Sequence, residues 1–329
     1  MNPFTYERSA EIESAVTVIA RSHSAKFLAG GTNLVDLMKN GVEKPDCLVD
    51  INRLALSKIE WLPDGGLRLG ALARNADTAN HPLVRKNYPL LSRAILSGAS
   101  PQLRNLATNG GNLLQRTRCP YFMDAGSPQC NKRVPGSGCG ALEGFHRTHA
   151  IFGANDKCVA THPSDMCVAL AALDAMIRVR GPQGERAIPI AEFHRLPGDT
   201  PEIDTNLRKD ELILSIDLPQ SPYAEHSCYL KVRDRASYEF ALISAAVALD
   251  MRGQTIHNAR IALGGVSHKP WRCPEAETIL LQQEVSASMF ERAAATALAH
   301  AQPLKQNAFK VELARRAIVH ALNNAGGLA

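Results

Sequence analysis

The spacing of apolar and polar residues in the amino-terminal part of the chain predicts a small unit of strands and helices. Apolar positions recur at helical intervals over residues 10–22, and a short apolar strand follows at 25–29. A helical turn at 34–39 and a second strand at 47–51 come next. We therefore expect residues 1–55 to form a small βαβ subdomain.

The middle of the chain combines helix and strand patterns between turns rich in glycine and proline. The pattern predicts a hairpin turn and strand at 64–70, a helix at 89–96, a helix capped by Ser164 at 164–173, strands on both sides of a turn at 181–184, and a strand at 210–218. We expect these elements to form a larger subdomain over residues 56–220, with an insertion at 115–160.

The last third of the chain shows a different order, with strands first and helices afterwards. Pro219, Pro222 and their neighbours form the best candidate linker. Strand patterns follow at 229–232, 242–249 and 260–263, and helical patterns at 275–281, 290–299 and 311–322. We expect a separate α/β domain over residues 221–329, built from a three-stranded sheet and three helices.

Composition and charge fit a globular chain with a large core. The chain has 329 residues, of which 45% are hydrophobic, and it can form two or three domains. Its formal charge is +5 without any block of like charges, which argues against a nucleic-acid partner. No apolar stretch reaches the roughly 18 residues that a membrane span needs.

The amino terminus bears on the compartment. Residues 1–8 show no basic segment followed by an apolar run. We therefore expect no signal peptide of the chain's own, and a cytoplasmic location or a periplasmic one reached by co-export with a partner subunit.

Four cysteines in a stretch rich in proline and glycine point to a metal cluster. They are Cys119, Cys130, Cys139 and Cys158, separated by ten, eight and eighteen residues. This spacing lacks the C-x2-C pairs of a zinc ribbon and the C-x-x-C dithiol of thioredoxin. An iron–sulfur cluster held by four thiolates fits better, and Pro120 follows Cys119 as in some ferredoxin ligand runs.

Disulfides and buried thiols are the alternative explanations for eight cysteines. A chain of this length and apolar content does not need disulfides for stability. We expect core packing for four of the cysteines, Cys47, Cys167, Cys228 and Cys273. Five cations near the other four cysteines either offset an anionic thiolate cluster or form a solvated basic face: Arg116, Arg118, Lys132, Arg133 and Arg147.

Two glycine loops favour a phosphate-bearing cofactor. One covers residues 29–33 and follows a predicted strand, and the other covers 108–112. Adjacent glycines let successive N–H groups turn toward one anion, and Thr and Asn side chains add further donors. Neither loop matches the Rossmann or P-loop pattern. A single Gly-Gly turn is usually only a turn, but two of them, both containing Thr and Asn, favour a dinucleotide.

These loops resemble a known family. Residues 26–34 resemble the first FAD loop of the medium subunits of molybdenum hydroxylases, and residues 108–113 resemble the second. The family includes xanthine dehydrogenase, carbon monoxide dehydrogenase and 4-hydroxybenzoyl-CoA reductase, and the resemblance covers nearly the whole chain. It implies an α+β fold of the PCMH type, with two FAD-binding subdomains and a carboxyl-terminal three-stranded sheet with helices, as in the carbon monoxide dehydrogenase flavoprotein.

The cysteine insertion narrows the resemblance. Most family members lack it, whereas residues 116–122 and 130–139 resemble the FAD and [4Fe-4S] subunit of bacterial three-subunit aldehyde oxidoreductases. Residues 231–238 and 264–272 strengthen this match. The corresponding subunit of a 4-hydroxybenzoyl-CoA reductase also carries a cluster in this region and remains the alternative.

The resemblance also implies site residues. The [4Fe-4S] ligands are then the four cysteines named above. The implied FAD contacts are Lys26, Phe27, Leu28, Ala29, Gly30, Gly31, Thr32, Asn33 and Leu34 around the pyrophosphate, with Thr108, Gly111 and Asn112 on the other side; Asp165 on a flavin hydroxyl; Leu212 or Ile213 near the adenine; and Lys231 on the isoalloxazine side. Asp165 is also open to a simpler role as an acidic residue in the first turn of a helix.

A subunit of this kind implies partners and a role as an electron outlet. Substrate is then oxidised at a molybdenum cofactor in a large subunit, and electrons pass through two [2Fe-2S] centres of a small subunit to FAD here and on to an external acceptor. No catalytic residue stands out in this chain. Xanthine dehydrogenases place a lysine near the flavin where this chain has residues 240–242, so the resemblance does not carry NAD use over.

Two further hypotheses compete with this one. The cysteines fit a zinc-stapled binding module without redox activity, and the glycine loops fit a self-sufficient FAD oxidase or reductase of the same fold.

Overall fold

A small parallel sheet forms the amino-terminal end of the molecule. The computed structural model describes residues 1–22 and 24–328. The sheet has the order β1-β3-β2, formed by Thr5–Arg8, Cys47–Asp50 and Lys26–Leu28. Helix α1 (Ile12–Arg21) buries its apolar side in the same small core, and α2 (Leu34–Lys39) directly follows the first glycine loop.

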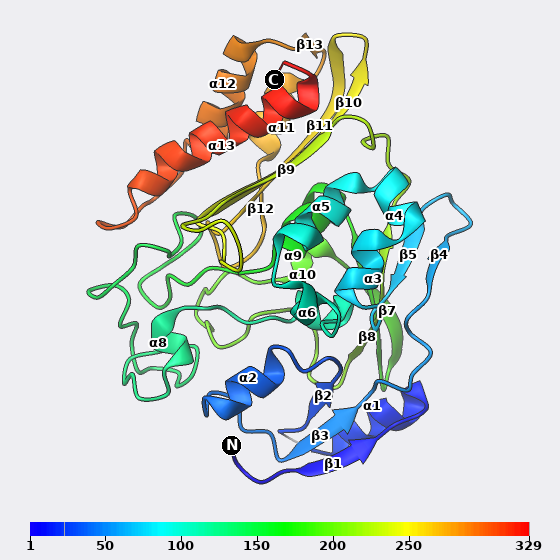
Figure 1. The fold of residues 1–329 in the computed structure, drawn as a ribbon. Coiled ribbons are helices and arrows are strands. Elements are labelled where there is room, and N and C mark those ends of the chain that lie inside the picture. Colours follow the sequence, from blue (N-terminus) through cyan, green and yellow to red (C-terminus); the bar gives the residue numbers. More distant parts are fainter. Residues whose placement is uncertain (23, 329) are drawn as a thin grey trace.

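The middle of the molecule is a five-stranded antiparallel sheet covered by helices (Figure 1). Its order is β4-β5-β8-β6-β7, formed by Ile59–Trp61, Leu67–Gly70, Leu212–Leu218, Met176–Gly181 and Gly184–Pro189. The helices are α3 (Asn75–Asn80), α4 (Pro82–Asn87), α5 (Pro89–Ser97), α6 (Pro101–Arg104), α7 (Asn109–Leu113), α8 (Pro120–Met123), α9 (Asp165–Ala172) and α10 (Ile190–Phe193). Helix α9 is buried along its whole length because it lies between this sheet and the carboxyl-terminal sheet.

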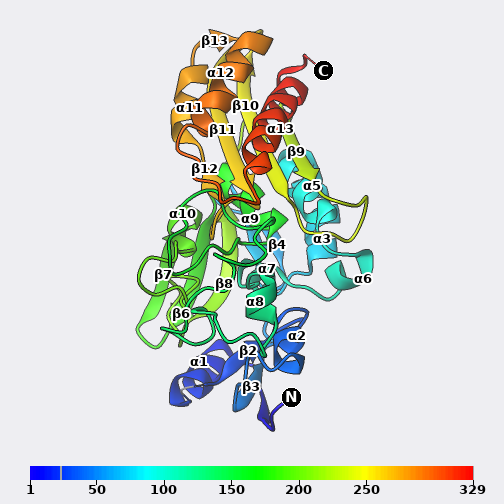
Figure 2. The same ribbon diagram turned by 90° about the vertical axis from the view of Figure 1, so that its left-hand side faces the viewer.

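The carboxyl-terminal domain has a second antiparallel sheet with helices on its outer face (Figure 2). Three long strands, β9 (Ser227–Val232), β10 (Ile243–Arg252) and β11 (Thr255–Gly264), are joined by two short ones, β12 (Trp271–Arg272) and β13 (Gln283–Glu284). The helices are α11 (Pro274–Leu280), α12 (Ala287–Ala297) and α13 (Phe309–Gly326).

Strand β10 joins the two cores because both of its faces are buried. Ala246 and Ala248 pack in the core that contains α5 and α9, whereas Val247 and Leu249 pack in the core beneath α11, α12 and α13. Side chains alternate between the faces of a strand, and small alanines on the first face let α9 approach closely. The carboxyl-terminal domain therefore holds the amino-terminal end of α9, where the candidate site lies.

Most predicted elements are present within a few residues of their expected bounds. The carboxyl-terminal sheet has two short strands beyond the three expected. Several short elements were not predicted from the sequence. They include β1, whose four residues are all exposed, and the helices of four to six residues α3, α4, α6, α7, α8 and α10. Such short helices bury too few residues to show a period. Over residues 1–22 and 24–328, no helix is long and apolar enough to cross a membrane.

Candidate functional site

The two glycine loops lie against each other. A Cβ atom on Gly30 would lie 2.1 Å from the backbone oxygen of Leu106, so only glycine permits this approach. Gly31 has φ of +69°, a backbone conformation that glycine adopts without strain. The Asn33 side chain accepts a hydrogen bond from the backbone N–H of Arg116 (3.0 Å). The first loop is thus fixed to the segments on both sides of the second.

Buried hydrogen bonds fix the second loop. Thr108 accepts a hydrogen bond from the N–H of Gly111 (3.2 Å) and so caps α7. The fully buried Asn109 donates to the backbone oxygen of Gly70 and exchanges hydrogen bonds with Thr78. Because Asn109 has no exposed surface, it supports the loop and leaves the exposed Gly111 to face a ligand.

Asn112 links this loop to the start of α9. Its side-chain oxygen accepts a hydrogen bond from Ser164 Oγ (2.6 Å), and Ser164 in turn caps α9 by accepting from the N–H of Cys167 (3.1 Å). The predicted cap at Ser164 is therefore present. Asp165 is the next residue, so the second glycine loop and Asp165 are held in one rigid unit.

Asp165 forms a buried ion pair with Lys231. Lys231 Nζ lies 2.8 Å from Asp165 Oδ2, and the two side chains are only 5% and 6% exposed. Tyr229 donates its hydroxyl to the other carboxylate oxygen (2.6 Å). Burial, together with this carboxylate, raises the pKa of Tyr229 far above its usual range, so Tyr229 stays a hydrogen-bond donor.

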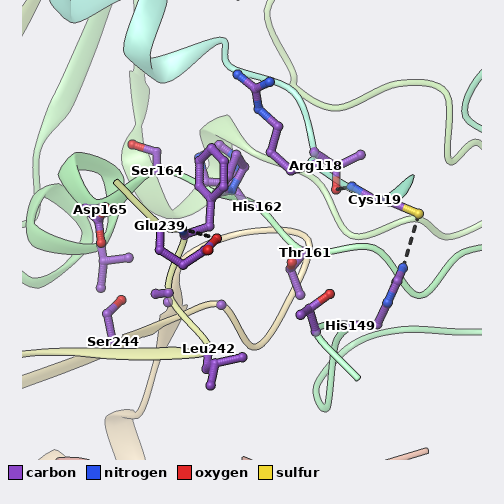
Figure 3. A pocket seen from close by; sticks show the side chains of 18 of the residues that line it. Arg118, Cys119, His149, Thr161, His162, Ser164, Asp165, Glu239, Leu242 and Ser244 are labelled. Atoms are coloured by element: carbon purple, nitrogen blue, oxygen red, sulfur yellow. Dashed lines mark hydrogen bonds between the residues drawn. The ribbon is translucent and has the colours of Figure 1, made fainter. Parts of the chain in front are cut away.

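A cavity of about 140 Å³ opens beside Asp165 (Figure 3). Typical cofactor sites measure about 300–1,000 Å³, so in this conformation the cavity encloses part of a dinucleotide rather than all of it. The residues that line it are Thr117, Arg118, Cys119, Thr148, His149, Thr161, His162, Pro163, Ser164, Asp165, Val168, Asp234, Glu239, Phe240, Ala241, Leu242, Ser244, Gly264 and Gly265.

The four cysteines of the insertion come together without forming disulfides. The backbones of Cys130 and Cys139 form an isolated antiparallel β-bridge, and Cys119 packs in the same small apolar cluster as Cys130. Burial raises the pKa of Cys119 to about 12, with further contributions from Cys158 and Cys130. Burial likewise raises the pKa of Cys158 to about 11, and Cys139 adds to it. All eight cysteines are free thiols, so the disulfide alternative is wrong for this structure.

The spacing of these sulfurs bears on which metal they fit. No three of the four described cysteine sulfurs lie within 4.8 Å of one another. A single zinc ion with Zn–S bonds of about 2.3 Å holds tetrahedral sulfurs roughly 3.8 Å apart. A cluster of four irons is wider than one ion, so its ligands stand farther apart. In the described conformation, no three of these sulfurs are therefore placed to bind one zinc ion.

The cations around the cysteines are mostly paired with carboxylates. Lys132 and Arg116 both bond to Asp204, and Arg116 also bonds to Glu43. Although burial opposes ionisation, Lys132 and Arg116 hold the pKa of Asp204 far below its usual range. Similar ion pairs join Arg118 to Asp36 and Arg147 to Asp234, while Arg133 donates to backbone oxygens. Most of these cations are therefore already neutralised by carboxylates. They are neither free to offset a thiolate cluster nor simply a solvated basic face.

Buried histidines line a second, smaller cavity of about 20 Å³. His162, His194 and His268 contain ring nitrogens without a hydrogen-bond partner among the described residues. Burial lowers the pKa of His194 to about 4 and that of His268 to about 3, so both rings are neutral. Nitrogens of His162 and His194 and the Cys167 sulfur lie within 4.8 Å of one another. The cavity has room for about one water molecule, which would satisfy the free nitrogens.

The comparisons with known proteins agree with the geometry. Residues 2–221 match the family described as the FAD binding domain in molybdopterin dehydrogenase, and residues 228–325 match the CO dehydrogenase flavoprotein C-terminal domain. The chain belongs to the FAD-binding medium subunits of the molybdenum hydroxylases. The predicted family and the predicted α+β fold are both confirmed.

Individual members of the family show different degrees of similarity to this medium subunit. It is 51% identical over 328 residues to the aldehyde oxidoreductase FAD-binding subunit PaoB of Escherichia coli K12, covering 99% of each chain. It is 28% identical to the glyceraldehyde dehydrogenase medium chain of Sulfolobus acidocaldarius, covering 86% of this chain and 83% of the relative. The carbon monoxide dehydrogenase structure from Hydrogenophaga pseudoflava superposes with a TM-score of 0.77 at 25% identity, covering 99% and 98%.

The predicted flavin residues fall into three groups in the medium subunit. Residues 27–34 and Asn112 are partly exposed, and Lys26 and Gly111 are exposed, so they can meet a ligand, whereas Thr108 is buried and its side chain caps α7. Asp165 lines the larger cavity, whereas Lys231 lies beneath it as the partner of Asp165. Leu212 and Ile213 are 2% and 4% exposed and pack in two different cores, so neither offers a free surface in this conformation. The assignments themselves stay predictions.

Most residues that line the larger cavity were not predicted from the sequence, and His149 is one of them. Its Nε2 atom lies 3.1 Å from Cys119 Sγ, and both residues line the cavity (Figure 3). No motif marks His149, because the contact joins residues 30 positions apart. The contact connects the predicted cluster to the predicted flavin site.

Proposed function

We propose that this medium subunit carries FAD and a [4Fe-4S] cluster and passes electrons within a molybdenum-dependent aldehyde oxidoreductase. Electrons from a large molybdenum subunit and a small subunit with two [2Fe-2S] centres leave through this chain to an external acceptor. The observation that carries the proposal is the cavity, where Asp165 and Cys119 line one space. The 51% identity to an aldehyde oxidoreductase subunit supports an aldehyde as the substrate of the complex.

The residues fit FAD. The first glycine loop is partly exposed at residues 30–33, where its backbone N–H groups and the Thr32 and Asn33 side chains supply donors of the kind that a pyrophosphate needs. The Asp165 carboxylate can accept a hydrogen bond from a flavin hydroxyl. Its negative charge is already balanced by Lys231, so a neutral hydroxyl is a suitable further partner. When bound, FAD exchanges electrons singly or in pairs and so connects one-electron centres to a two-electron acceptor.

The residues also fit a four-iron cluster. Four free thiols are gathered from one insertion, and two of them are buried. Metal binding replaces the thiol protons, which offsets the burial that raises the pKa of Cys119 and Cys158. No three of the described sulfurs lie within 4.8 Å of one another, and this favours the cluster over a single zinc ion. Among the alternatives, the close aldehyde oxidoreductase relative favours an aldehyde over a 4-hydroxybenzoyl-CoA substrate.

The chain's own residues position the groups and shield them. Phe240 lies over the Arg118 guanidinium, 5.3 Å from its carbon to the ring centroid, and both residues border the cavity. Arg147 holds Asp234 on the same rim by two hydrogen bonds. These contacts tie the 234–242 segment to the cysteine insertion, so they restrict the access of water to the cavity.

The function is tested in the intact complex, purified with its large and small subunits. An aldehyde is added without oxygen or acceptor while the visible absorbance of the flavin is followed. The proposal expects the flavin to be reduced within the turnover time and to be reoxidised when an acceptor is added. Aldehyde oxidation with a flavin that stays oxidised would contradict it.

The cluster ligands are tested separately. Cys119→Ser, Cys130→Ser, Cys139→Ser and Cys158→Ser should each remove the EPR signal of the reduced [4Fe-4S] cluster. Cys47→Ser is the matched control, because Cys47 is buried in the core of the small subdomain and should leave the signal unchanged. A cluster signal retained in all four variants would show that other residues hold the iron.

A further inference from the structure

Among the described residues, the contact between His149 and Cys119 is the one hydrogen bond from the cavity wall to the sulfur of a predicted cluster ligand. The distance from His149 Nε2 to Cys119 Sγ is 3.1 Å, short for a contact with sulfur, and Figure 3 shows it along the edge of the cavity. His149 is 2% exposed, so water does not compete for its ring. Asp165, the predicted flavin contact, lines the same cavity.

The direction of this hydrogen bond follows from the chemistry of the ligand. A cysteine bound to iron is a thiolate and has no proton to donate. The hydrogen must therefore lie on Nε2, and His149 donates to the sulfur. The other ring nitrogen, Nδ1, has no partner among the described residues, which agrees with the tautomer that carries its proton on Nε2.

The carboxyl-terminal helix α13 holds His149 in place. Lys310 is fully buried and donates from Nζ to the backbone oxygen of His149 (2.8 Å), and to those of Thr148 and Gly265. Asn307 donates to the same His149 oxygen (3.1 Å). The His149 backbone is therefore fixed by two buried donors, and its ring is itself buried against Cys119.

We propose that His149 is a positioning residue that donates a hydrogen bond to the Cys119 thiolate at the edge of the flavin cavity and thereby raises the reduction potential of the cluster. The inference rests on the proposed function, because it needs a cluster on Cys119. Reduction adds one electron to the cluster and moves no proton, since His149 keeps its proton in both states. The added negative charge strengthens the hydrogen bond, so the reduced state gains more from it.

The test is an EPR-monitored redox titration of the intact complex, with dithionite as the reductant. His149→Phe removes the donor and should lower the equilibrium constant for cluster reduction about tenfold, a fall of about 59 mV for one electron. His149→Gln retains an N–H donor and should stay close to the wild type. An unchanged potential in His149→Phe with its iron retained would overturn the proposal.

A matched control separates this effect from a general loss of histidine. His226→Phe makes the same substitution at a histidine whose ring contacts Ala325 in the carboxyl-terminal domain, and it should not change the cluster potential. The flavin potential, read from visible absorbance in the same titration, should stay unchanged in His226→Phe and should shift much less than the cluster potential in His149→Phe. A uniform shift of both centres would indicate a structural effect and contradict the specific role of His149.

A second measurement needs no substitution. Pulsed EPR of the reduced wild-type complex, prepared with ¹⁵N-labelled histidine, should show hyperfine coupling to one histidine nitrogen. A reduced cluster without this coupling would overturn the proposal even if His149→Phe loses its iron. Absence of any cluster in the wild type would instead refute the proposed function, so the two failures are distinguishable.

Discussion

The ion pair between Asp165 and Lys231 gives the sharpest stability prediction. Lys231→Met removes the ammonium but leaves the Asp165 carboxylate buried, with Tyr229 as its remaining hydrogen-bond donor. Breaking a buried pair from one side costs about 3–5 kcal/mol, because the remaining charge has lost both water and its partner. Asp165→Asn should cost a similar amount, because it removes the negative charge beside the buried Lys231 ammonium and leaves it only neutral acceptors such as the backbone oxygen of Ser97.

The expected loss can be read as a change in melting temperature. Unfolding entropy is roughly 2.1 cal/mol/K per residue, so for 329 residues a loss of about 3–5 kcal/mol lowers the thermal midpoint by about 4–7 °C. Scanning calorimetry of the purified chain at pH 7 measures it. The double variant Lys231→Met/Asp165→Asn leaves no unpaired charge, so it should lose at least about 2 kcal/mol less than the sum of the single variants.

Two results would refute this reasoning. A fall of less than about 1 °C for Lys231→Met would mean that the pair is solvated in the folded chain. Additive losses in the double variant would mean that the two side chains do not interact. Lys305→Met is the control: Lys305 is exposed and has no carboxylate partner among the residues that the structure describes, so the midpoint should stay nearly unchanged.

The remaining predictions concern the glycine loop and the small subdomain. Gly30→Ala forces its new methyl group from 2.1 Å to at least 3.4 Å from the Leu106 oxygen, so the loops must separate and the flavin content of the purified chain should fall at least about tenfold. Gly41 has a positive φ but open space around it, so Gly41→Ala should retain flavin. Equal flavin content in the two variants would contradict the role of the Gly30 loop in binding FAD. Although burial opposes it, hydrogen bonds from Tyr6, Asn52 and Arg8 lower the pKa of Asp50 to about 2. Asp50→Asn should therefore destabilise the chain by about 1–2 kcal/mol above pH 4, and the difference from the wild type should shrink as the pH falls from 4 toward 2. Urea unfolding at several pH values measures this, and a difference independent of pH would contradict the ionised role of Asp50.

Local features of the site were readable from the sequence. The glycine loops, the Ser164 cap and the four cysteines each belong to one short segment, and their spacing carries the chemistry. Cysteines in a loop rich in proline and glycine have no packing role to explain them. For this reason the insertion and the first glycine loop stood out without any knowledge of the fold.

Contacts between distant segments could not be predicted in this way. Lys231 reaches Asp165 only because β9 lies beside the start of α9, and the two residues are 66 positions apart. His149 meets Cys119 because α13 holds its backbone from the carboxyl-terminal domain. The family resemblance implies that Leu212 or Ile213 packs near the adenine, and this stays a prediction; that strand β8 buries both residues in two different cores could not be predicted, because only the assembled sheet defines those cores.

The central claim is that one chain holds both FAD and a four-iron cluster. The most direct test is to assay iron, acid-labile sulfide, zinc and flavin on one anaerobic sample of the purified chain, with absorption and EPR spectra before and after dithionite. The account predicts about one flavin and four iron per chain, with a reduced [4Fe-4S] signal. Zinc on the cysteines, or flavin without iron, would contradict it.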